Sequence, residues 1–114
     1  MGGRPRLKTY SAETGHVYQY SFAGQRALES GAEYVFDVRR DRSSRFRAFV
    51  FVADAGIRSW QEAHGRELIS GERYAIAKLA LQRFLDSLET ENETVEITPG
   101  ADEIEQILAD LGRD

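Results

Sequence analysis

The chain has 114 residues, of which 41% are hydrophobic and 30% charged, a composition typical of one folded soluble domain and not of a disordered tail. It contains no cysteine, which excludes disulfides, thiolate metal ligands and cysteine nucleophiles. No apolar run approaches the ~20 residues of a membrane-spanning helix, and the N-terminus has no apolar signal segment. We therefore expect a cytoplasmic protein that makes no membrane contact.

The net charge of −4 is unevenly distributed along the chain. Residues 1–50 hold nine Lys/Arg and five Asp/Glu, whereas residues 51–114 hold six and fourteen. An acidic total argues against a protein devoted to coating nucleic acid, but the first half leaves room for a local cationic surface.

Residues 1–14 carry Gly, Pro and scattered charge without periodicity, which predicts a flexible basic N-terminal arm before a single domain over residues 15–114. Residues 16–22 alternate His and aromatic side chains with smaller ones and predict a first strand. Glycines 24 and 31 then predict a loop or a single helical turn.

The stretch YVFDVRRDRSSRFRAFVFVAD, residues 34–54, predicts a β-hairpin with a cationic tip and with arms at residues 33–40 and 45–53. A turn through residues 41–44 would place Arg40 opposite Arg45 and Phe36 opposite Phe49. The run of residues 48–53 has no polar position. We therefore expect the second arm to be a central strand that is covered on both faces.

Helix signals follow the hairpin. Asp54 is suited to cap a short helix over residues 55–64 that Gly65 ends, and Ser70 is suited to cap a long amphipathic helix over residues 71–89. Residues 94–98 alternate as an edge strand, and Thr98-Pro99 predicts the start of a last helix over residues 99–111. The elements predict an α+β fold: a small antiparallel sheet of about four strands, in the order β-β-β-α-α-β-α, with helices packed mainly on one face.

No catalytic motif is present. The two histidines, His16 and His64, sit in no recognisable constellation, and Gly65 breaks the helix that would bring His64 and Glu67 together as metal ligands. The acidic cluster lacks the glycine and spacing of a calcium loop; it comprises Glu89, Glu91, Glu93 and Glu96. We predict no catalytic residue, no metal and no cofactor, and rank an enzyme that uses either histidine last.

Two surfaces remain as candidates. An apolar hairpin face could meet a protein partner or a second copy of the chain, and a non-enzymatic interaction or self-association module is our main hypothesis. That face would include Phe46, Val50 and Val52. The alternative is that the hairpin arginines contact nucleic-acid phosphates, although for the cluster itself we favour a charged tip that prevents edge pairing. These arginines are Arg39, Arg40, Arg42, Arg45 and Arg47.

Overall fold

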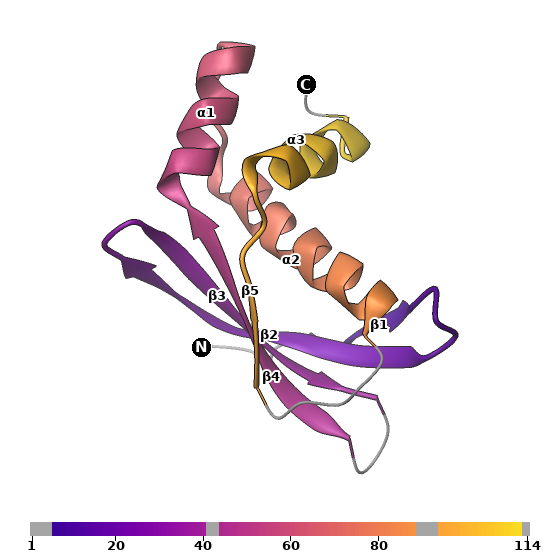
Figure 1. Cartoon of the computed structure of the whole chain (residues 1–114). Helices are drawn as coiled ribbons and strands as arrows, with labels where there is room; N and C mark the ends of the chain where they lie inside the picture. Colours follow the sequence, from indigo (N-terminus) through magenta and orange to yellow (C-terminus); the bar gives the residue numbers. More distant parts are fainter. Residues whose placement is uncertain (1–5, 41–43, 89–93, 113–114) are drawn as a thin grey trace.

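The computed structural model describes residues 6–40, 44–88 and 94–112. They form a five-stranded sheet and three helices, which confirms the predicted α+β class (Figure 1). In chain order the elements are β1 (Lys8–Ser11), β2 (Val17–Leu28), β3 (Gly31–Arg39), β4 (Arg45–Ala53), α1 (Asp54–His64), α2 (Ser70–Ser87), β5 (Thr94–Ile97) and α3 (Ala101–Asp110).

The strands lie in the order β1-β2-β3-β4-β5, and each neighbouring pair is antiparallel except β4 and β5. The parallel pair follows from the connection, because α1 and α2 carry the chain from the end of β4 back to the edge where β5 begins. The sheet is therefore mostly antiparallel, as predicted, but has one strand more than expected and one parallel edge.

The additional strand is β1. Residues 8–11 fall within the stretch whose composition predicts a flexible arm, yet they pair with residues 17–20 of β2. The Tyr10 hydroxyl donates to Asp86 Oδ1 at 2.7 Å, and the Glu13 N–H donates to the same oxygen at 3.0 Å. A long-range polar contact to α2 thus holds the N-terminal strand, and periodicity over four residues could not reveal it.

The hairpin register differs from the predicted one by a single residue. Tyr34 lies opposite Val50, and Phe36 lies opposite Ala48. The Arg40 N–H donates to the Ser44 carbonyl at 2.9 Å, which extends the ladder and leaves residues 41–43 for the connection. Because side chains alternate between the faces of a strand, this shift exchanges the two sides of β4, and the predicted faces were wrong.

The helices cover one face of the sheet and enclose the core with it (Figure 1). Tyr18, Phe36 and Val50 are at most 1% exposed on the sheet side. The helices contribute Trp60 from α1, Ile76, Leu81 and Leu85 from α2, and Ile104, Ile107 and Leu108 from α3. The predicted placement of helices mainly on one face is thus observed.

The predicted capping residues do not occupy the N-cap positions, and at the start of α2 the Glu72 side chain accepts the Ile69 N–H. The N-cap positions are Ala53, Ile69 and Gly100, one to two residues away from the expected Asp54, Ser70 and Thr98. Gly65 does end α1, in the left-handed conformation with φ of 70° and its N–H bonded to the Gln61 carbonyl. The predicted end of the long helix at residue 89 lies outside the described residues.

Candidate interaction surface

The face of the sheet opposite the helices is the largest candidate surface, and we call it the open face. Side chains at alternate positions of β3 and β4 point toward the open face, since the side chains at the intervening positions are buried under the helices. Among the described residues, no helix packs over this side (Figure 1). Across its centre run Glu33, Val35, Asp37 and Arg39 of β3 and Arg45, Arg47, Phe49 and Phe51 of β4.

The middle of the open face is apolar. Val35 lies directly opposite Phe49, and both are partly exposed. The Phe51 ring lies over Gly31, since a Cβ built on that glycine would be only 2.7 Å from Phe51 Cζ. At the end of β2 the Leu28 side chain, 39% exposed, borders a shallow groove of about 260 Å³ beside both phenylalanines. We call Val35, Phe49 and Phe51 the apolar trio.

The hairpin end of the open face is charged. Arg47 Nε donates to Asp37 Oδ1 at 2.9 Å, in an ion pair whose two side chains are about half exposed. Arg39 Nε donates to Gln19 Oε1 at 3.0 Å, and Arg45 is exposed. A groove of about 420 Å³ runs between these groups and Leu7, which is 53% exposed.

The structure brings together three of the five arginines singled out from the sequence, Arg39, Arg45 and Arg47. Arg40 flanks the connection of the hairpin, and Arg42 lies outside the described residues. Carboxylates share the same face: Asp37 accepts from Arg47, and Arg26 of β2 pairs with Glu33 at 2.7 Å. The surface is therefore of mixed charge and is not a continuous cationic track.

The residues expected at an interface are placed elsewhere. Phe46, Val50 and Val52 are 7%, 0% and 3% exposed and belong to the core. They cannot reach a partner in the folded chain, so this assignment is corrected. The cause is the one-residue shift of the hairpin, which turns Phe49 and Phe51 outward in their place. The alternation of β4 predicted that Phe49 and Phe51 lie on the opposite face from Val50 and Val52, but it could not show which face the helices cover.

The two histidines lie in different surroundings, and one of them pairs with a carboxylate. His64 Nε2 lies 2.8 Å from Glu105 Oε2, which links the end of α1 to α3, and the His64 ring stacks on Trp60 at 4.3 Å. His16 is exposed beside the Tyr18 ring. Within residues 6–40, 44–88 and 94–112, no cluster of three or more His, Asp or Glu side chains could hold a metal ion. Of the acidic cluster, only Glu96 is among the described residues.

Comparisons with protein-family models, with curated proteins and with solved structures found no match to this chain. None of the described helices is long and apolar enough to cross a membrane. The chemistry of the surfaces is therefore the basis for a functional assignment.

Proposed function

We propose that this protein is a non-enzymatic self-association module that dimerises through the open face of its sheet. The observation that carries the proposal is the apolar trio, which lies in the middle of a sheet face that no described helix covers. Sheets with one apolar face gain stability by packing that face against another sheet, at a separation of about 10 Å.

A second copy suits this face in size. Strands about 4.8 Å apart and up to twelve residues long, at about 3.3 Å per residue, give an area on the order of 600 Å² per copy. Stable interfaces bury roughly 800 Å² per partner, and weaker ones bury less. The face is therefore large enough for a reversible dimer, which we expect at micromolar concentrations.

A second copy also suits the charges. A two-fold axis that runs across the strands at the level of the Val35–Phe49 pair would stack Val35 and Phe49 on their own copies and place Phe51 opposite Arg47 of the other copy. The same axis reverses the strand direction, which places Arg45 of one copy toward the Glu33 end of the other. The net positive hairpin end of one copy then faces the end of the other copy that carries Glu33, and two net positive ends do not meet.

The test is the mass of the protein in solution between about 1 and 200 µM, measured by sedimentation equilibrium. We expect the mass to rise from that of one chain toward that of two, and Phe49→Glu to hold the protein at the mass of one chain. Ile69→Glu is the matched control, because Ile69 is 67% exposed at the start of α2, a helix that covers the other face of the sheet. A wild-type mass that stays at one chain throughout, or equal effects of the two variants, would overturn the proposal.

Nucleic-acid binding is a second candidate. Arg45 and Arg47 share a strand face with Phe49 and Phe51, and this combination suits phosphate contacts beside base stacking. The carboxylates Asp37 and Glu33 on the same face weaken it, so we rank it below self-association. Fluorescence anisotropy with labelled single-stranded DNA and RNA at low salt tests it. Binding that falls steeply with salt and weakens in an Arg45→Ala, Arg47→Ala variant would support it; no binding at low salt would remove it.

A further inference from the structure

A second concave site lies on the helix side of the sheet, at the junction of β3 and β4 with the first turns of α1 and α2. Its volume is about 300 Å³, at the lower end of the range for small-molecule sites. Val52, Ile57 and Leu68 form an apolar wall. The space is also lined by hydrogen-bonding and charged side chains: Gln25, Tyr34, Asp54, Ser70 and Arg73.

Tyr34 is a largely buried aromatic residue whose hydroxyl is open to the pocket. It is 3% exposed, and its hydroxyl makes no hydrogen bond with any residue that the structure describes. Burial raises the pKa of Tyr34, while the nearby positive charge of Arg73 acts to lower it. A ligand group that accepts from or donates to this hydroxyl would add one direct hydrogen bond to the protein.

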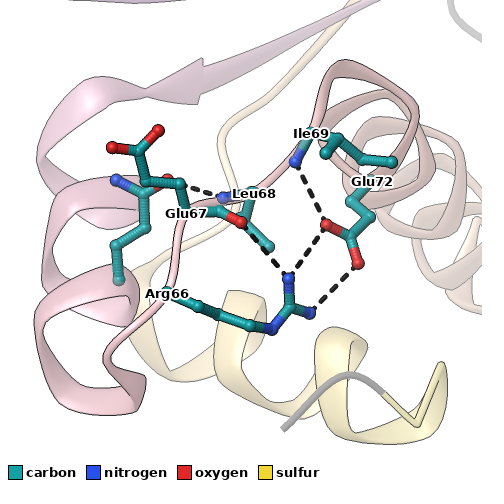
Figure 2. A network of polar contacts seen from close by, with 6 residues as sticks. Arg66, Glu67, Leu68, Ile69 and Glu72 are labelled. Carbon is teal, nitrogen blue, oxygen red and sulfur yellow. Dashed lines mark hydrogen bonds and ion pairs between the residues drawn. The ribbon is translucent and has the colours of Figure 1, made fainter.

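Two opposite charges face the same space without forming an ion pair. Arg73 lies on the first turn of α2 and is half-buried, yet it makes no hydrogen bond or ion pair within residues 6–40, 44–88 and 94–112. The exposed carboxylate of Asp54, the first residue of α1, likewise makes no hydrogen bond or ion pair with the residues that the structure describes. The neighbouring acid Glu72 cannot neutralise Arg73, because Arg66 engages it (Figure 2).

The wall that Leu68 contributes is held in place. The Leu68 N–H donates to Gln61 Oε1 at 2.8 Å, and the Ile69 N–H donates to Glu72 Oε1 at 3.1 Å (Figure 2). Arg66 bridges this segment by donating to the Glu67 carbonyl and to both Glu72 oxygens. The pocket is therefore largely preformed, which lowers the cost of ligand binding.

We infer that this pocket binds a free α-amino acid with an apolar side chain. Arg73 and the Tyr34 hydroxyl hold the carboxylate, Asp54 holds the ammonium group, and the apolar wall takes the side chain. Asp54 would repel a simple anion and Arg73 would repel a simple cation, whereas a zwitterion neutralises both charges. The volume equals that of roughly ten water molecules, which matches a whole amino acid of the size of leucine or phenylalanine.

The first test is an NMR titration of the ¹⁵N-labelled protein with L-leucine and L-phenylalanine. We expect saturable shifts of the amides that surround the pocket. The two partial analogues of leucine, 4-methylpentanoate and 3-methylbutylamine, should bind at least tenfold more weakly, because each leaves one charge of the pocket unpaired. Absence of saturation with both amino acids at about 20 mM overturns the inference. An analogue that binds as well as leucine overturns it too.

Variants localise the binding. Arg73→Gln and Asp54→Asn should each weaken leucine binding at least tenfold, and Tyr34→Phe about threefold or more while leaving the ring in the core. The matched control is Arg58→Gln, because Arg58 is exposed on α1 and does not line this space. Equal affinities of the Arg73 and Arg58 variants would contradict the site. Thermal unfolding of each variant shows whether it is folded.

Discussion

Glu72 at the start of α2 should be one of the most sensitive polar positions of the protein. Its side chain is 11% exposed, and its carboxylate serves two structural tasks (Figure 2). Oε1 accepts the Ile69 N–H at 3.1 Å, which satisfies a donor at the helix start in the absence of a capping side chain. Both oxygens accept from Arg66, at 3.3 and 3.1 Å. Glu72→Ala removes both interactions at once.

The expected loss follows from these contacts. A lost helix-start bond costs about 1 kcal/mol. Breaking the Arg66 pair costs less than the 3–5 kcal/mol of a fully buried pair, because the Arg66 side chain is 38% exposed and can be hydrated. We therefore expect Glu72→Ala to lower the free energy of unfolding by about 2–3 kcal/mol. Glu72→Gln, which keeps an acceptor but loses the charge, should cost about half as much.

The assay is urea unfolding followed by circular dichroism. Glu67→Ala is the control, because this carboxylate is exposed and only its backbone carbonyl joins the network; it should change stability by less than about 0.5 kcal/mol. A loss below about 1 kcal/mol for Glu72→Ala, or a loss no larger than that of the control, would refute the reasoning about this cluster.

Three further predictions concern the packing. Burial, and then the hydrogen bond to Asp86, raise the pKa of Tyr10 from 10.0 to about 12. The neutral Tyr10 side chain therefore contributes its full share of the folding stability below pH 10, and this contribution is lost between pH 10 and about 12. In urea unfolding at pH 8–11.5, Tyr10→Phe should flatten the fall of the unfolding free energy with pH. Gly31→Ala should cost more than about 2 kcal/mol, since its Cβ would lie 2.5 Å from a backbone oxygen, whereas Gly71→Ala, with open space around it, should be neutral or stabilising; thermal unfolding distinguishes them. Val50→Ala should cost about 2–3 kcal/mol by urea unfolding, because Val50 is 0% exposed, and a loss below about 1 kcal/mol would contradict the observed register.

Local sequence patterns correctly predicted the long helix α2 and the end of α1. The spacing of Ile76, Leu81 and Leu85 predicted the long helix, because a 3.6-residue period in apolar side chains has no other common explanation. Gly65 predicted the end of α1 because it can adopt a left-handed conformation at little cost. The strand of residues 16–22 proved to be part of a longer β2, which continues past Gly24 through a register shift and takes up the expected loop.

Long-range contacts decided what the sequence could not predict about the candidate sites. Tyr34 and Arg73 are distant along the chain, and only the packing of α2 against the β3–β4 hairpin brings them to one pocket. The tip arginines were recognisable as a cluster, but their pairing with Asp37 and Gln19 depends on which residues are neighbours across strands.

Composition and periodicity by themselves determined that this chain forms an α+β domain with a central hairpin and amphipathic helices, because burial imposes a repeat of two on strands and of 3.6 on helices. They could not determine which side of the hairpin the helices cover, since β4 is apolar at alternate positions on both faces near its end. The observed register of β3 and β4, in which the Arg40 N–H donates to the Ser44 carbonyl, sends Val50 into the core and turns Phe49 and Phe51 outward. The residues available to a partner were thus decided only in the tertiary structure.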